Sequence, residues 1–404
     1  DNRDENMGFL SKTLLPDGTE IPGTNFDYNY LQHRKVDVVS SALDFILPFE
    51  KYKITAGAKV SFTNTRNGIN YDTSDPTLVQ DDYFRYKEQI YALYADYSRE
   101  YSERFSMQLG LRMEHTRTTG ISEAKDTEDK HDYTRLFPTV YLLYSPTDGH
   151  ALNFSFSNRI SRPSQNMVNP FPFYQNKYTY ACGREDLKPS YTYNAELGYT
   201  LKNNFNVSAY YSYSDDVFFQ VVDLDAETNV TSFLWENFMK THAFGLNNSY
   251  TFRTKWLQAY AQHGVSYRRT TSSAVTTSPE EKGWAYDASL RNTFFFNEKK
   301  TLLATLSGSY SSRQYQGIYL MSPTYSVSAG MLYRLLNNKL NLSLNVNNLF
   351  VSHSKLETMS NGLKIIADNQ FSFTSFRIGV SYTFGGDIRS KGQRNSNEDI
   401  QRRL

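Results

Sequence analysis

The sequence predicts an all-β fold, a transmembrane antiparallel β-barrel of which about 15 strands are present. From about residue 36 to residue 385, apolar and polar residues alternate in segment after segment, which is the period-two pattern of a β-strand. The connections between these segments are alternately short and long. Aromatic residues make up 15% of the chain, and they suit both strands and membrane surfaces.

The first strand is expected at residues 39–49, and the last one ends near Phe384. Many segments have about twelve residues, whereas strands of soluble proteins usually have about 5–6 and tilted membrane strands need about 9–11. In the segment LNLSLNVNNLF, residues 340–350, Leu342 and Leu344 alternate with asparagine and serine. This strand alone does not tell whether its apolar face packs on a soluble core or meets lipid. Other clear segments are residues 53–62, 105–116, 205–213, 301–310 and 325–335.

The lengths of the connections favour the second possibility, that the apolar strand faces meet lipid. Outer-membrane barrels have tight periplasmic turns and long extracellular loops, whereas a soluble sandwich has no reason to sort its loops by end. We therefore expect a multi-pass β-barrel in the outer membrane of a gram-negative bacterium, with the apolar strand faces against outer-membrane lipid. The short connections lie near residues 50–51, 101–102, 146–149, 202–204, 254–255, 298–299 and 337–338, and the long ones near 66–82, 118–132, 163–190, 223–230, 270–283, 312–323 and 352–365.

The polar strand faces are expected to line a wet lumen, because a charge on the lipid face near the bilayer midplane would cost about 2–4 kcal/mol. Arg112 and Glu114 share one such face, and we expect them to form an ion pair that braces the barrel or a plug inside it. The charged residues expected in the lumen are Lys59, Arg112, Glu114, Arg159, Glu196, Arg291 and Arg334.

Composition and motifs exclude several other classes. The net charge of +1 gives no support to nucleic-acid binding. Cys182 is the only cysteine, so no internal disulfide framework or multi-cysteine metal site is possible, and a reactive or lipidated role for it is secondary to an incidental one. The acidic cluster Lys125-Asp126-Thr127-Glu128-Asp129 could hold Ca²⁺, but it lacks the glycine turn and fixed spacing of a Ca²⁺ loop, so a solvated loop is favoured. The chain carries no enzyme signature, so no catalysis, metal or cofactor is expected.

The strand count leaves a problem at the N-terminus. We assign residues 35–386 to the barrel strands and residues 387–404 to a periplasmic tail, and residues 1–34 read as an extracellular loop or the end of an upstream segment. Fifteen strands is an odd number, while bacterial single-chain barrels usually have an even one. Either residues 1–34 hide one strand, near Met7–Leu15, or an N-terminal part of the barrel lies upstream, which we favour.

Residues 158–199 resemble the barrel of TonB-dependent outer-membrane receptors, in the branch described as outer membrane β-barrel proteins. Residues 183–186, Gly-Arg-Glu-Asp, depart from the Gly-Asn-Pro of that family, and Ser190 replaces an acidic residue. The resemblance implies a barrel of about 22 strands, an N-terminal plug and contact with TonB only through that plug region, with this chain covering about the last fifteen strands. The matching motifs are Arg162-Pro163-Ser164, Asn169-Pro170-Phe171, Leu187-Lys188-Pro189 and Glu196-Leu197-Gly198-Tyr199.

The same segment is the most aromatic of the long loops. Its rings are expected first to pack the loop over the barrel mouth and second to contact a ligand directly. The candidates are Phe171, Phe173, Tyr174, Tyr178 and Tyr180.

The end of the last strand resembles the signal that the barrel-assembly machinery recognises, a polar residue, a glycine and two aromatic residues. Arg377, Gly379, Tyr382 and Phe384 fit this pattern, although any lipid-facing strand can show it by chance.

The function implied by the resemblance is that of an outer-membrane TonB-dependent receptor that takes up a scarce ligand through a plugged barrel. One alternative is a structural or assembly barrel in a surface or secretion complex, with a surface lipoprotein or other subunit as partner. The other is a passive porin of about sixteen strands, which would require residues 1–34 to supply one more strand.

Overall fold

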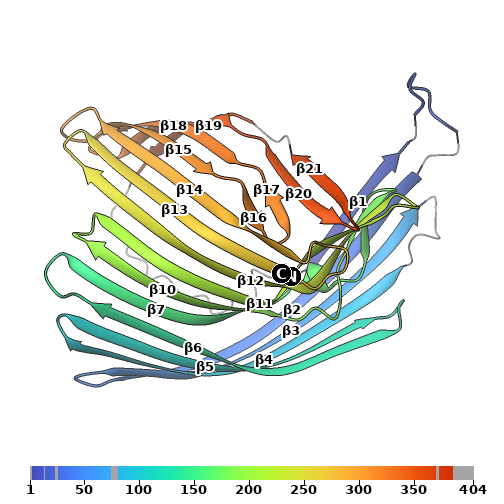
Figure 1. Cartoon of the computed structure of the whole chain (residues 1–404), viewed down its shortest axis with the longest axis horizontal. Coiled ribbons are helices and arrows are strands. Elements are labelled where there is room, and N and C mark those ends of the chain that lie inside the picture. Colours follow the sequence, from blue (N-terminus) through green and yellow to red (C-terminus); the bar gives the residue numbers. More distant parts are fainter. Residues whose placement is uncertain (1, 13, 23–25, 74–80, 370–372, 385–404) are drawn as a thin grey trace.

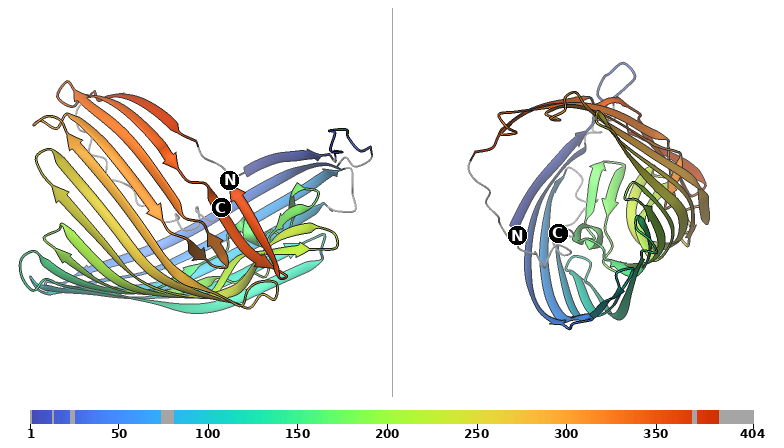
Figure 2. Two further views of the ribbon diagram at one scale, coloured as in Figure 1. Left: turned by 45° about the horizontal axis from the view of Figure 1, so that its top comes forward. Right: turned by 90° about the vertical axis from the view of Figure 1, so that its left-hand side faces the viewer.

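The computed structural model describes residues 2–12, 14–22, 26–73, 81–369 and 373–384, and most of its strands form the wall, one large curled sheet (Figures 1 and 2). Long strands pair with their neighbours in chain order, and β2 and β3, for example, run side by side from Tyr28 opposite Thr73 to Pro48 opposite Lys53. The wall strands are β1 (Asn2–Ser11), β2 (Phe26–Pro48), β3 (Lys53–Thr73), β4 (Asp82–Ser102), β5 (Phe105–Ser122), β6 (Thr127–Tyr144), β7 (His150–Ser161), β10 (Ser190–Leu201), β11 (Phe205–Asp225), β12 (Val230–Arg253), β13 (Leu257–Ser272), β14 (Glu280–Phe295), β15 (Leu302–Ser311), β18 (Thr324–Leu335), β19 (Leu340–Val351) and β22 (Ser375–Tyr382).

The wall is not closed. Among the described residues, no pairing joins β1 to β22, so each of these strands has one neighbour in the wall. The connections at one end of the wall are all short, and the long loops lie at the other end, together with two short connections, between β5 and β6 and between β11 and β12 (Figure 1). Asn337 and Asn338 occupy a short turn with positive φ angles of 54° and 67°, a backbone conformation that asparagine adopts more readily than most residues.

The N-terminal part differs from the sequence prediction. Residues 1–34, which we read as a loop, contain β1 and the first part of β2, and β1 spans Asn2–Ser11 rather than Met7–Leu15. The alternation is present but has an unusual composition, since Tyr28, Tyr30 and Gln32 face inward and are buried while the residues between them are polar or exposed. A strand that continues above the membrane keeps a polar outer face, and its sequence therefore looks like a loop.

The same effect shortens several predicted loops. Residues 66–82 and 118–132 were expected as loops, yet β3 continues to Thr73 and β5 and β6 are joined only by residues 123–126. The fifteen strands expected between residues 36 and 385 all occur, with β1 in addition. The predicted tail at 387–404 lies outside the described residues.

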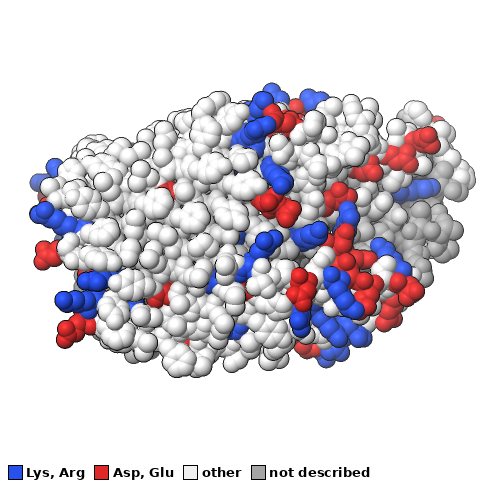
Figure 3. Space-filling model, turned by 60° about the horizontal axis from the view of Figure 1, so that its bottom comes forward, with Lys and Arg blue, Asp and Glu red and all other residues white. Residues whose placement is uncertain are grey.

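One face of the wall forms an apolar belt. In β19, Leu342 and Leu344 are exposed, while Asn341, Ser343 and Asn345 on the other face are partly covered. Figure 3 shows a broad stretch of the outer surface nearly free of charge, with Lys, Arg, Asp and Glu at the left end and from the middle of the view to the right end. Exposed rings flank the aliphatic residues, as in membrane barrels. They include Phe49, Tyr101, Tyr144, Tyr250, Trp256, Phe296, Tyr333 and Tyr382 near the short-turn end and Tyr91, Tyr211, Phe244, Trp284, Tyr310, Tyr325 and Phe376 farther up the strands.

The hydrophobic cores lie at the long-loop end, not inside the belt. A small second sheet packs there against the ends of β11 and β12, and Tyr319 donates a hydrogen bond from its hydroxyl to the Gln220 carbonyl at 2.7 Å. Among the described residues, no helix is long and apolar enough to cross a membrane. The second sheet contains β16 (Gln314–Gln316), β17 (Tyr319–Met321), β20 (Ser354–Ser360) and β21 (Leu363–Asn369).

We predict that Leu344→Arg destabilises the full-length protein in phospholipid vesicles by about 2–4 kcal/mol, because the guanidinium would lie in the apolar belt. Asn345→Arg, on the opposite face of the same strand, should change the free energy of unfolding by less than about 1 kcal/mol. Urea unfolding followed by tryptophan fluorescence measures both, and equal losses would contradict the assignment of the two faces.

Candidate functional site

The loop between β7 and β10 folds back into the space enclosed by the wall. It contains a single helical turn, α1 (Gln165–Val168), and a hairpin of β8 (Pro172–Asn176) and β9 (Thr179–Cys182). β9 also pairs in parallel with β12, from Thr179 opposite Thr231 to Cys182 opposite Leu234. The right-hand view of Figure 2 shows this hairpin inside the curve of the wall. We refer to residues 162–189 as the inner loop.

Aromatic packing holds the inner loop against β2, β3 and β4. Phe171 is only 2% exposed and lies edge-on to Phe84, with 6.4 Å between the ring centroids. Tyr28 contacts Tyr174 at 5.2 Å between centroids, and the hydroxyls of Tyr28 and Tyr71 both donate to the Pro172 carbonyl, at 3.1 and 3.2 Å. Burial raises the pKa values of both tyrosines well above the usual range, so their hydroxyls stay protonated and remain donors.

A close approach of two backbone segments explains Gly183. A Cβ atom at this position would lie 2.2 Å from the Asn169 carbonyl oxygen and 2.6 Å from that of Met167. The next residue, Arg184, donates its backbone N–H to the Met167 carbonyl at 2.8 Å. Only glycine allows α1 and the chain after β9 to lie in contact.

A buried ionic cluster fixes the start of the inner loop to the wall. The Arg162 guanidinium donates from Nη2 to Glu114 Oε2 at 2.5 Å and to Thr116 Oγ1 at 3.2 Å. Its Nε lies 3.9 Å from Glu88 Oε1, and Arg112 completes the cluster by donating to Glu114. Glu114 is only 6% exposed and Glu88 only 4%, so these carboxylates depend on Arg162 to offset their desolvation.

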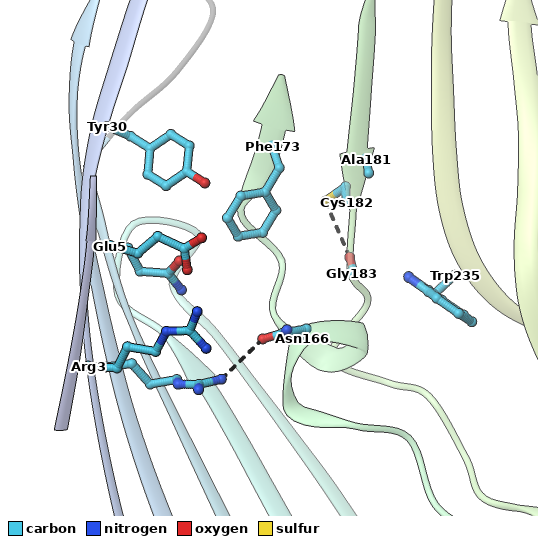
Figure 4. A pocket seen from close by; sticks show the side chains of 11 residues that line it. Arg3, Glu5, Tyr30, Asn166, Phe173, Ala181, Cys182, Gly183 and Trp235 are labelled. Atoms are coloured by element: carbon cyan, nitrogen blue, oxygen red, sulfur yellow. Dashed lines mark hydrogen bonds between the residues drawn. The ribbon is translucent and has the colours of Figure 1, made fainter. Parts of the chain in front are cut away.

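A cavity of about 290 Å³ lies between the inner loop and β1, β2 and β12 (Figure 4). β1 and β2 contribute charged and polar side chains, the inner loop contributes Phe173 and Asn166, and β12 contributes Trp235. Arg34 Nη1 lies 3.5 Å from Asn166 Oδ1, within reach of a weak hydrogen bond that spans the cavity wall. The lining is Arg3, Glu5, Tyr30, Gln32, Arg34, Asn166, Phe173, Ala181, Cys182, Gly183 and Trp235.

The cavity has a positive character. Two guanidinium groups, of Arg3 and Arg34, face one carboxylate, of Glu5. Burial lowers the pKa of Arg34, nearby Arg3 lowers it further, and Glu5 opposes the change. The mutual repulsion of Arg3 and Arg34 would be relieved by an anionic group, while Tyr30, Phe173 and Trp235 offer ring surfaces.

The structure separates the predicted loop aromatics. Phe171 is buried in the packing of the loop, Tyr174 and Tyr180 contact each other at 5.2 Å between centroids, and Tyr178 is exposed. Phe173 alone among these five lines the cavity. Ligand contact by any of them stays a prediction.

The predicted lumen charges all lie on the strand face opposite the apolar belt, but only Arg112 and Glu114 come together. Arg159 and Arg291 are exposed, whereas Lys59, Glu196 and Arg334 are partly covered. Arg377, Gly379 and Tyr382 lie on β22, followed by the exposed Phe384, which leaves their role in assembly a prediction.

Several residues of the site were not singled out in the sequence: Arg3, Arg34, Glu88 and Trp235. Arg162 appeared only as part of a motif. Cys182 is partly buried, and its thiol donates to the Pro170 carbonyl at 3.1 Å. Burial raises the pKa of this thiol, an effect that nearby Lys125 opposes. In the part of the chain that the structure describes, no group of three or more His, Cys, Asp and Glu side chains could hold a metal ion.

We predict that Arg162→Ala loosens the inner loop, because removal of one partner from a buried ionic cluster costs about 3–5 kcal/mol. The single cysteine reports this directly. Maleimide labelling of Cys182 at neutral pH should be at least tenfold faster in Arg162→Ala, and its pH profile should shift to lower pH as the thiol regains an ordinary pKa. Arg159→Ala, three residues earlier and exposed, is the control and should label like the unmodified protein. Unchanged labelling in Arg162→Ala would contradict the anchoring role.

Comparison with known proteins identifies solved structures that share this architecture. The copper transporter OprC superimposes with a TM-score of 0.61 at 12% identity, over 95% of this chain and 65% of that one. The ferric yersiniabactin uptake receptor FyuA from Yersinia pestis gives 0.61 at 16% identity, over 89% and 56%. The ferric citrate transporter FecA in its unliganded form gives 0.58 at 13%, over 94% and 61%.

At these identities the likeness shows the fold alone, and the chain spans about half to two thirds of the length of the solved structures. No curated protein matches the chain. Residues 1–382 match the outer membrane protein beta-barrel family. Because this match covers nearly the whole sequence, the chain belongs to the outer membrane protein beta-barrel family and is a multi-pass β-barrel protein of the outer membrane.

Proposed function

We propose that the chain forms the C-terminal part of an outer-membrane receptor that captures a scarce ligand at its extracellular mouth and takes it up through a plugged barrel. The cavity of about 290 Å³ at the mouth is the observation that carries this proposal. Its two arginines and three rings suit a ligand with an anionic group and a flat or apolar part. Ferric citrate, the cargo in the name of one structural neighbour, is of the anionic kind.

The geometry of the wall supports a larger, closed barrel. β1 and β22 each present an edge, and an unpaired edge inside a membrane leaves backbone groups without hydrogen bonds, which costs several kcal/mol per group. Further strands between these two edges, about six for a barrel of about 22, would pair both. A plug inside the barrel would contact exposed inward charges such as Arg159 and Arg291 and would connect the barrel to TonB.

One observation favours a second candidate. β1 adds one strand to the fifteen expected, which gives the even number that a passive porin of about sixteen strands would need. In that case β1 would have to pair with β22. A purely structural barrel in a surface complex would use neither an open channel nor the cavity.

Planar-bilayer recordings separate the plugged receptor from the porin. We expect the full-length protein to show no steady ion conductance, because a plug fills the lumen. A stable open conductance would contradict the receptor and favour the porin. Heat-modifiable migration on a denaturing gel confirms in both cases that the inserted protein is folded.

A binding experiment tests the cavity. With ferric citrate as the probe, we expect Arg34→Ala to weaken binding to the full-length protein at least tenfold, since a charge-assisted hydrogen bond contributes about 1.5–3 kcal/mol. Arg291→Ala removes an arginine far from the cavity and should leave the dissociation constant within about twofold. Calorimetric titration measures both variants, and equal affinities would remove the cavity from the proposal.

A further inference from the structure

The outer face of β2, β3 and β4 carries three cations in direct register. Lys35 lies opposite Arg66, and Arg66 lies opposite Arg85. These side chains are on the same strand faces as the apolar residues of the belt, because positions four apart on a strand share a face. Like charges directly opposite one another in a sheet are destabilising, so a bound anion would relieve the repulsion within this row.

Two further cations extend the row. Lys87 follows Arg85 on the outer face of β4, and Arg117 is exposed on the outer face of β5. We refer to Lys35, Arg66, Arg85, Lys87 and Arg117 as the basic outer patch.

Carboxylates neutralise only part of the patch. Asp37 accepts a hydrogen bond from Arg66 at 2.8 Å, and Asp132 accepts one from Arg117 at 2.8 Å. In the described part of the chain, no carboxylate forms an ion pair with Lys35, Arg85 or Lys87. The patch therefore keeps a surplus of positive charge on an exposed surface.

The position of the patch relative to the lipid is set by the strands. Lys35 is four residues above Val39, Arg66 four above Phe62 and Lys87 four above Tyr91, and the lower residue of each pair is exposed in the belt. Four residues correspond to about 14 Å along a strand and, at the tilt of barrel strands, to about 10 Å along the membrane normal. The patch thus lies at the level of the lipid headgroups.

The other side of the wall lacks such a surplus. At a similar height on β12, β13 and β14, Lys240 pairs with Asp215 at 3.1 Å, Arg269 with Glu280 at 2.6 Å and Lys282 with Glu280 at 2.6 Å. These cations share two carboxylates within hydrogen-bonding distance. The unpaired charge on β2 to β4 is therefore a local feature and not a general property of the upper edge of the belt.

We propose that the basic outer patch binds the phosphates of a multiply phosphorylated lipid in the outer leaflet. Guanidinium groups donate paired N–H hydrogen bonds to phosphate oxygens, and a row of three strands spaced about 4.8 Å apart spans two phosphates on one headgroup. The acyl chains of the same lipid then lie along Val39, Phe62 and Leu93 in the belt. This proposal rests on the location in the outer membrane and not on the proposed uptake.

Binding of purified lipids to the full-length protein in dodecyl maltoside micelles tests this inference. The probes are diphosphoryl lipid A, monophosphoryl lipid A and phosphatidylethanolamine, and native mass spectrometry measures the bound fraction. The test variant is Lys35→Gln, Arg66→Gln and Arg85→Gln combined. The matched control is Lys240→Gln, Arg269→Gln and Lys282→Gln, which removes the same charge at a similar height on the other side.

We expect the test variant to lose at least tenfold in affinity for diphosphoryl lipid A and the control to change by less than twofold. The unmodified protein should prefer diphosphoryl over monophosphoryl lipid A, and inorganic pyrophosphate at equal concentration should not displace the lipid, because it lacks acyl chains. Equal affinities of the test and control variants, or displacement by pyrophosphate, would overturn the proposal. Lys87→Gln alone, at a solvent-exposed position, should still weaken binding about threefold if the triple variant does not fold.

Discussion

The need of every backbone N–H and C=O group in the bilayer for a hydrogen-bond partner is the constraint from which the rest of this structure follows. Strands satisfy it only by pairing with neighbours, which is why the wall strands follow one another in chain order with antiparallel registers. Pairing in turn fixes on which face of the sheet each side chain lies. Once Leu344 points to lipid, Asn345 must point inward, and the side chains of the whole wall are sorted in the same way.

The inner loop solves a different problem, because its polar backbone and charges lie inside the protein. Burying Glu88 and Glu114 is unfavourable unless a cation accompanies them. Arg162, the first residue after β7, lies next to both carboxylates and provides this charge. The aromatic residues on the other side of the loop then pack against rings of β2 and β4. The loop is thus held by charge at its beginning and by apolar contacts along its hairpin.

The sequence was sufficient for features that depend on local alternation, and insufficient for those that depend on contacts across the fold. Residues 340–350 show a regular period of two, and the strand was found where expected. Tyr28 and Tyr30 follow the same period, but Asp and Asn between them suggested a loop, since those residues face water above the membrane. The ion pair of Arg112 and Glu114 could be predicted because both lie on one strand. The contacts of Arg162 and Glu88 in this cluster could not be predicted, because these residues are far apart in the chain and nothing in the sequence shows that they meet. Phe171 was expected to pack or to bind, and only its contact with Phe84 shows that it is part of the packing.

The parallel pairing of β9 with β12 has a mechanical consequence. The inner loop touches β2 through its rings and β12 through backbone hydrogen bonds, so it spans the mouth as a strut between two distant parts of the wall. Because the inner loop is tied to both parts, a movement of β2 relative to β12 would have to break either the ring contacts or the backbone hydrogen bonds. The hairpin therefore couples the positions of two strands that are not neighbours in the wall.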